Sequence, residues 1–149
     1  MYEVELKVAA DHAPVRERLA TLDAEPLGVV EQVDTYFEHP VRDFAETGEA
    51  FRIRRESTGG NTDSRLAYKG PLVESASKTR REVETGVDDG ATMTQIVEDL
   101  GFEPVESVEK HRERFDHGEY TVSLDTVAGL GEYVEVETEA EAVELAHCG

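Results

Sequence analysis

The sequence predicts an α+β fold: an eight-stranded antiparallel β-barrel with helices packed against its outside, built from two similar halves. Several segments alternate apolar and charged residues at every second position, which is typical of strands with two different faces. Helical periodicity is confined to short stretches between these segments. The order of strand, helix and three strands occurs twice along the 149 residues, and two four-stranded halves facing each other would close a barrel.

The first half begins with alternation at residues 3–8, where positions 3, 5 and 7 are charged and positions 4, 6 and 8 are apolar. A helix is expected over residues 11–24, with Asp11 as its N-cap. Its apolar stripe consists of Val15, Leu19 and Leu22. Further strands are expected at residues 29–37, 50–56 and 65–70, with an exposed hairpin loop over residues 57–64 that contains Gly59 and Gly60.

The second half begins with a strand expected at residues 79–85, followed by a helix over residues 90–100 that ends at Gly101. The apolar stripe of this helix consists of Met93, Ile96, Val97 and Leu100. Strands are then expected at residues 107–115, 119–126 and 132–137. A short closing helix is expected from Thr138, which could form a capping box with Glu141.

Residue matches between the halves support an internal duplication. The pattern of Glu25-Pro26 and Val30-Glu31 recurs as Glu103-Pro104 and Val108-Glu109 at a displacement of 78, and Glu3-Val4-Glu5 recurs as Glu82-Val83-Glu84 at a displacement of 79. We therefore expect a single domain over residues 1–149 with halves at about 1–72 and 77–149.

The composition is strongly acidic, with 34 Asp and Glu against 15 Lys and Arg, a formal charge of −19. Such a surface repels nucleic acids and anionic membranes, so neither is expected as a partner. Only four of the basic residues are Lys, and a carboxylate-rich, Lys-poor surface is typical of a halophile. No stretch reaches the ~20 apolar residues of a membrane span, no signal peptide is evident, and a cytoplasmic location is expected. The single cysteine, Cys148, excludes an internal disulfide.

The charged positions of the strands share one parity, which holds eight of the 15 basic residues and only seven of the 34 acidic ones. These positions are Glu3, Glu5, Lys7, Arg52, Arg54, Lys69, Arg80, Glu82, Glu84, Lys110, Arg112, Arg114, Asp125, Glu135 and Glu137. One interpretation is an open sheet whose charged face meets solvent. The favoured interpretation is a barrel with apolar residues outward, under the helices, and charges of both signs lining the lumen.

The lumen residues indicate a polyphosphate bound with a divalent metal ion. The carboxylates are hard oxygen ligands that suit Mg²⁺ or Mn²⁺, and the candidate metal ligands are Glu3, Glu5, Asp125, Glu135 and Glu137. The basic side chains can clamp a polyanion, and the candidate triphosphate-binding residues are Arg52, Arg54, Lys69, Arg80, Lys110 and Arg112. The five histidines show no ligand spacing and are taken as surface or structural residues.

The same residues resemble the CYTH superfamily, the triphosphate tunnel metalloenzymes. The resemblance begins at Glu3-Val4-Glu5-Leu6-Lys7 and covers nearly the whole chain in order. It continues through Asp34-Thr35-Tyr36-Phe37, Phe51-Arg52-Ile53-Arg54, Leu66-Ala67-Tyr68-Lys69-Gly70-Pro71, Ser77-Lys78-Thr79-Arg80, Lys110-His111-Arg112, Leu124-Asp125 and the stretch from Gly129 to Glu137. Several of these motifs look most like the class IV adenylyl cyclases, and the acidic composition suggests a member from a halophilic archaeon. The resemblance implies a tunnel that holds triphosphate on its basic residues and divalent metal on its glutamates.

Two reactions remain open. An adenylyl cyclase converts ATP to cyclic AMP and pyrophosphate, and the cyclase is favoured because the motifs resemble that branch. The alternative is a triphosphatase that hydrolyses inorganic triphosphate, thiamine triphosphate or a nucleoside triphosphate; a non-catalytic polyphosphate-binding module is a third possibility. Lys7 is a candidate general base, although a metal-bound hydroxide or direct activation of the alkoxide would serve equally. The expected partner is a nucleoside triphosphate or another triphosphate, and the protein is expected to be a monomer or a homodimer.

Overall fold

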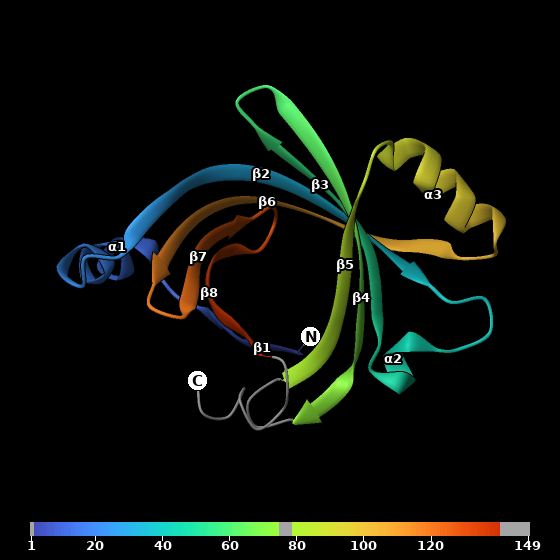
Figure 1. Cartoon of the computed structure of the whole chain (residues 1–149), viewed down its shortest axis with the longest axis horizontal. Helices are drawn as coiled ribbons and strands as arrows, with labels where there is room; N and C mark the ends of the chain where they lie inside the picture. Colours follow the sequence, from blue (N-terminus) through green and yellow to red (C-terminus); the bar gives the residue numbers. More distant parts are fainter. Residues whose placement is uncertain (1, 75–78, 141–149) are drawn as a thin grey trace.

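The computed structural model describes residues 2–74 and 79–140 and shows a closed antiparallel barrel with three helices outside it (Figure 1). In chain order the elements are β1 (Tyr2–Ala9), α1 (His12–Thr21), β2 (Glu25–Glu38), α2 (Phe44–Thr47), β3 (Ala50–Thr58), β4 (Asn61–Glu74), β5 (Thr79–Val87), α3 (Gly90–Asp99), β6 (Glu103–His117), β7 (Tyr120–Val127) and β8 (Gly131–Ala140). Around the barrel the strands follow the order β1-β5-β4-β3-β2-β6-β7-β8, which confirms the predicted fold class and excludes the open sheet.

The strands β2 and β6 form the longest seam of the barrel and lie side by side across it (Figure 1). Their pairing runs from Glu25 opposite Asp116 to Glu38 opposite Glu103. Both strands begin four residues earlier than the alternation predicted, because their pairing continues past two irregularities, one around Gly28 near the start of β2 and one at Tyr36 and Phe37 near the start of β6. The φ of Gly28, 103°, is readily available only to glycine. Within the described residues, the seam between β1 and β5 has three register pairs, Tyr2 to Val4 against Arg81 to Thr79.

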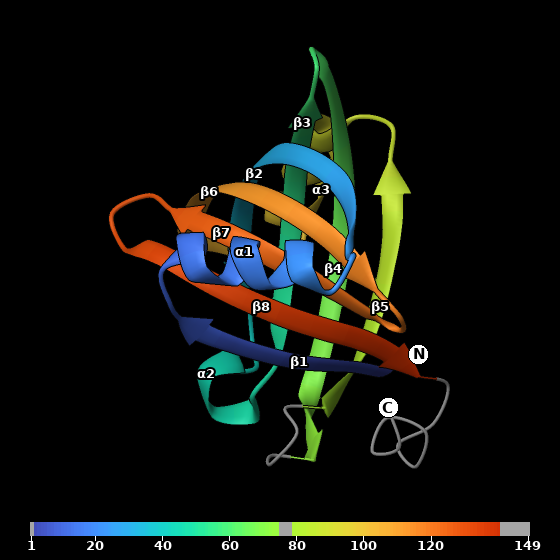
Figure 2. The same cartoon turned by 90° about the vertical axis from the view of Figure 1, so that its left-hand side faces the viewer.

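Helix α1 covers the outer face of β6, β7 and β8 (Figure 2). Its Leu19 packs in a buried cluster with Phe115, Val122, Leu124 and Val134, while the predicted stripe residue Leu22 is 41% exposed. Asp11 holds the N-cap position as expected, although its side chain makes no capping hydrogen bond. The core under α1 therefore lies between the helix and the wall of the barrel.

Helix α3 covers a second cluster on the opposite part of the wall. Val97 packs there with Phe37 and Ile53, and Met93 lies against the same cluster. Two of the four predicted stripe residues, Ile96 and Leu100, are instead exposed. Within the described residues, no helix is both long and apolar enough to cross a lipid bilayer.

Three local predictions differ from the structure. The hairpin after β3 is a two-residue turn at Gly59 and Gly60, both with positive φ, so the flanking strands extend through the expected loop. The short helix α2 was not predicted. Thr138 lies in β8 opposite Val4, and not at a helix start, because pairing with β1 continues past residue 137; Glu141 and the rest of the expected helix lie outside the described residues.

Candidate active site

The inward faces of the strands enclose a charged cavity of about 400 Å³. Its lining contains eight basic and eight acidic side chains, so the predicted enrichment of charge in the lumen is observed. The basic residues are Lys7, Arg52, Arg54, Arg65, Lys69, Lys110, Arg112 and Arg114. The acidic residues are Glu3, Glu5, Glu56, Glu82, Glu84, Glu135, Glu137 and Glu139.

Three carboxylates gather where β1 meets β8. Glu3, Glu5 and Glu137 each offer an oxygen, and these three oxygens lie within 4.8 Å of one another. The register explains the proximity, because Glu5 pairs with Glu137 across the two strands and Glu3 is the next inward residue on β1. Burial, followed by the charges of Glu135 and Glu3, raises the pKa of Glu137 to about 7. Burial also raises the pKa of Glu3.

The ammonium of Lys69, on β4, lies against this group. Its Nζ is 3.2 Å from Oε1 of Glu3 and 3.5 Å from Oε2 of Glu5, and the side chain is 16% exposed. Burial would lower the pKa of Lys69, but the carboxylates of Glu3 and Glu5 outweigh it, so that pKa is raised. Lys69 is therefore a charged counter-ion of the carboxylate group.

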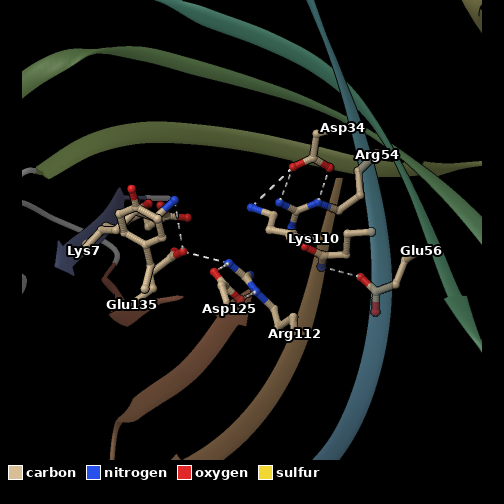
Figure 3. A network of polar contacts seen from close by, with 12 residues as sticks. Lys7, Asp34, Arg54, Glu56, Lys110, Arg112, Asp125 and Glu135 are labelled. Carbon is tan, nitrogen blue, oxygen red and sulfur yellow. Dashed lines mark hydrogen bonds and ion pairs between the residues drawn. The ribbon is translucent and has the colours of Figure 1, made fainter. Parts of the chain in front are cut away.

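Arg54 and Lys110 converge on the buried carboxylate of Asp34 (Figure 3). Nε and Nη2 of Arg54 donate to the two oxygens of Asp34 at 2.7 and 2.9 Å, and Nζ of Lys110 lies 3.5 Å from Oδ2. Burial alone would raise the pKa of Asp34, but Arg54, together with Lys110, lowers it to about 2. The fully buried Asp34 thus holds one edge of the guanidinium while Arg54 still lines the cavity.

Arg112 is held in the same way by Asp125, with two hydrogen bonds of 2.7 Å (Figure 3). Its Nη2 also donates to Oε2 of Glu135 at 2.7 Å. Asp125 has no exposed surface and both its oxygens bind Arg112, so the structure does not bring it to Glu3, Glu5 and Glu137 as the metal prediction required. The alternation correctly predicted that Asp125 faces inward. It could not show that Arg112, on the neighbouring strand β6, donates hydrogen bonds to both oxygens of this carboxylate.

Several cationic groups of the cavity retain free binding capacity. Burial, and then the charges of Arg112 and Arg54, lower the pKa of Lys110 to about 8. Among the described residues, the buried Nε atoms of Arg52 and Arg114 have no hydrogen-bond partner. A polyanion placed in the cavity would relieve the repulsion at Lys110 and accept hydrogen bonds from both Nε atoms.

The remaining predicted residues lie at the edges of this arrangement. Nζ of Lys7 is 3.9 Å from Oε2 of Glu135, with the Lys7 side chain 41% exposed. Arg80 lies outside the main lining, in an adjoining pocket that also contains Lys7, Tyr36 and Lys69. Glu135 lines the cavity but is bound to Arg112.

The site prediction from sequence missed several residues that the structure brings into the site. Glu82, Glu84 and Arg114 share the inward parity but were not assigned a role, so the alternation could have found them. The other missed residues are Asp34, Tyr36, Glu56, Arg65 and Glu139. For Asp34 and Tyr36 the available signal was the Asp34-Thr35-Tyr36-Phe37 motif, which is one of the motifs that carry the family resemblance.

The donor set fits both groups that the charge pattern implies. Three clustered carboxylates offer the hard oxygen ligands that Mg²⁺ and Mn²⁺ prefer. The guanidinium groups and Lys110 face the same cavity and suit phosphate oxygens. The fold and the site together define a closed barrel built to hold a metal-bound polyanion.

The chain belongs to the CYTH domain family, which matches residues 1–147. Proteins of this family are metal-dependent enzymes that bind triphosphate substrates in such a tunnel. The family assignment agrees with the resemblance found in the sequence motifs.

Individual relatives support the same family. A Methanocaldococcus jannaschii protein named "Putative adenylate cyclase" is 41% identical over 138 residues, which cover 92% of this chain and 77% of that protein. A solved Pyrococcus horikoshii structure superposes with a TM-score of 0.89 at 35% identity, covering 97% of this chain and 82% of the other. A Hippeastrum protein, described as a putative adenylyl cyclase with a dominant triphosphatase activity, has a TM-score of 0.65 at 17% identity, covering 99% of this chain and 82% of the other. A likeness at that identity shows the fold alone.

Proposed function

We propose that this protein is a metal-dependent adenylyl cyclase that converts ATP to cyclic AMP and pyrophosphate inside the barrel. The observation that carries the proposal is the division of the cavity into a carboxylate trio, Glu3, Glu5 and Glu137, and a wall of buried cations. A nucleoside triphosphate carries about four negative charges, which require both metal and cations for neutralisation. The name of the Methanocaldococcus jannaschii relative supports the cyclase.

In this proposal the trio holds Mg²⁺ or Mn²⁺, which would act as a Lewis acid on the phosphate oxygens. Arg54 and Arg112, each fixed by a buried aspartate, present their remaining N–H groups to the triphosphate. Their fixed positions favour one geometry of the phosphate chain, in which the ribose 3′-oxygen can attack the α-phosphorus as the bond to pyrophosphate breaks. The 3′-hydroxyl proton must pass to a base, for which Lys7 stays the candidate.

A triphosphatase is the second candidate, because the charged cavity would hold inorganic triphosphate, thiamine triphosphate or a nucleoside triphosphate by the same contacts. The activity described for the Hippeastrum neighbour favours keeping it. In that reaction water attacks the terminal phosphorus and orthophosphate leaves.

Product analysis separates the two candidates. The purified protein is incubated with ATP and Mg²⁺ or Mn²⁺ in high salt, and the products are separated by chromatography. Cyclic AMP with an equal amount of pyrophosphate supports the cyclase. ADP with orthophosphate, or cleavage of inorganic triphosphate without cyclic nucleotide, would reject it in favour of the hydrolase.

A pair of matched variants tests the metal site in the same assay. Glu5→Gln keeps the shape of a trio member and removes its charge, so turnover should fall by at least about a hundredfold in limiting Mn²⁺. The control is Glu31→Gln, an exposed glutamate on the outer face of β2, which should retain activity. Full activity of Glu5→Gln would contradict the metal assignment.

A further inference from the structure

In one part of the charged cavity, a bulge in β2 brings an apolar side chain into the lining. Leu27 lies where the register of β2 against β6 shifts between Pro26 and Gly28. Such bulges re-aim side chains next to binding sites. Among the described residues, Leu27 is the one aliphatic side chain that lines this cavity, and it is 45% exposed. A ligand in the cavity can therefore cover an apolar surface here.

Arg114, which pairs with Gly28 across the bulge, belongs to a group of three polar side chains linked by hydrogen bonds. Its Nη2 donates to Oε1 of Glu56 at 3.2 Å, and Nε2 of Gln32 donates to Oε2 of the same carboxylate at 3.0 Å. Each carboxylate oxygen can accept more than one hydrogen bond. Since the Glu56 side chain is 19% exposed and lines the cavity, it can still bind a donor from a ligand.

Two atoms of this group have no hydrogen-bond partner in the described part of the chain. They are Oε1 of Gln32 and Nε of Arg114, and both atoms are buried. A buried polar atom without a partner is costly, so such atoms indicate a ligand that completes their hydrogen bonding. An acceptor and a donor thus stand on either side of the Glu56 carboxylate.

The charge around Arg114 suits a neutral group better than a phosphate. The buried aspartates that hold Arg54 and Arg112 have no exposed surface, so a phosphate can approach these two arginines without meeting a carboxylate. Glu56, in contrast, lines the cavity itself. A phosphate at Arg114 would therefore be repelled by an accessible negative charge.

Adenine has the complementary set of groups. Its exocyclic amino group donates and its neighbouring N7 accepts, and side chains recognise adenine by this pair. The amino group can donate to Glu56 while N7 accepts from Nε of Arg114, and Leu27 can cover a face of the ring. Hypoxanthine carries an oxygen in place of the amino group, and this oxygen would face the carboxylate with no proton between them.

We propose that Leu27, Gln32, Glu56 and Arg114 recognise the base of the substrate and select adenine over hypoxanthine. The inference rests on the proposed function, because it requires a nucleoside triphosphate in the cavity. Glu56 and Arg114 contact the base, and Gln32 is a positioning residue that orients Glu56. The phosphate-binding cations do not distinguish ATP from inosine triphosphate, since the two differ only in the base.

The test compares ligands that share the triphosphate and differ at the base. Binding of ATP, inosine triphosphate and tripolyphosphate to the full chain is measured by isothermal titration calorimetry in EDTA, which removes divalent metal and prevents turnover. We expect the wild type to bind ATP at least about tenfold more tightly than inosine triphosphate.

Glu56→Gln keeps the shape of the side chain, and its amide can donate to the oxygen of hypoxanthine. In this variant the affinities for ATP and inosine triphosphate should lie within about threefold of each other. The control is Glu31→Gln, which makes the same change of charge at an exposed position on the outer face of β2 and should keep the preference of the wild type.

A second variant keeps the test decisive if Glu56→Gln does not fold. Leu27→Ala removes the apolar surface at an exposed position, so it should weaken ATP binding about fivefold and leave tripolyphosphate binding unchanged. Equal wild-type affinities for the two nucleotides, an unchanged preference in folded Glu56→Gln, or unchanged ATP binding in Leu27→Ala would overturn the inference and leave triphosphate binding standing.

The proposed function fails in a different way. If neither nucleotide nor tripolyphosphate binds, the triphosphate site and the inference are overturned together. If ATP binds with the expected preference but yields ADP and orthophosphate in the product analysis, the cyclase is rejected and base recognition stands.

Discussion

Asp34 sets the orientation of the Arg54 guanidinium through two hydrogen bonds. The shape of this group should therefore matter for phosphate binding as much as its charge. Lysine cannot bind both oxygens of Asp34 while also facing the cavity. We therefore expect Arg54→Lys to weaken tripolyphosphate binding about tenfold, about 1.4 kcal/mol, in isothermal titration calorimetry. Arg16→Lys, on the outer surface of α1, is the control and should bind as the wild type does. Equal affinity for both variants would show that Arg54 contributes charge alone.

We expect Lys110 to make anion binding dependent on pH. Its pKa is lowered to about 8 by burial and by Arg112, Arg54 and Lys7, against the attraction of Asp34. A bound polyanion favours the charged ammonium and raises this pKa, so binding above pH 8 requires proton uptake by Lys110. The affinity for tripolyphosphate should therefore be greatest below pH 8 and fall as pH rises through 8, by up to about tenfold per pH unit.

Comparison with Lys110→Met isolates this effect, because both proteins bind the same ligand and its own titration cancels. The dissociation constant of the wild type for tripolyphosphate, measured from about pH 6.5 to about 9.5, should approach that of Lys110→Met as pH rises. A constant ratio between the two proteins over this range would rule out the titration of Lys110 as the cause.

At the scale of elements, the start of α3 is packed closely against β4. A Cβ added at Gly90 would lie 2.4 Å from Oγ and 2.9 Å from Cβ of Ser64. Gly90→Ala should therefore lower the free energy of unfolding by about 1 to 3 kcal/mol, even though alanine favours helix more than glycine does.

A double-mutant cycle in urea tests whether this contact is responsible. In the background of Ser64→Gly the obstructing side chain is absent, so Gly90→Ala should become neutral or stabilising. If Gly90→Ala costs the same in both backgrounds, the close approach of α3 to β4 is not the cause of the loss.

For the whole molecule, the net charge of −19 governs the response to salt. The basic residues are concentrated in the lumen, which leaves many carboxylates of the outer surface without opposite charges nearby. Repulsion among them is relieved by screening, so the melting temperature should rise from 0.1 to about 3 M KCl, by roughly 3 °C for each kcal/mol gained. Scanning calorimetry measures this shift, and a flat or falling melting temperature would reject a halophilic adaptation, which stays a prediction.

The sequence by itself determined the barrel and the composition of its lumen. Side chains of a strand alternate between two faces, so the period of two along β1, β3, β6 and β8 was enough to sort inward charges from outward apolar residues. Short connections and the repeated element order then allowed few topologies other than a closed ring. The strand ends were less accurate, because pairing with a neighbour extended β2 and β6 beyond their alternating segments.

Only the tertiary structure decided which charges meet. Alternation assigns Asp125 and Lys69 to the inward face but is silent on their partners, which lie on strands 13 to 66 residues away. Those partners are set by the hydrogen-bonded register of each seam and by the curvature that closes the ring. For this reason Asp125 looked like a metal ligand in the sequence and is a buried anchor for Arg112 in the fold, while Lys69 looked like a free cation and is bound to the carboxylates of Glu3 and Glu5.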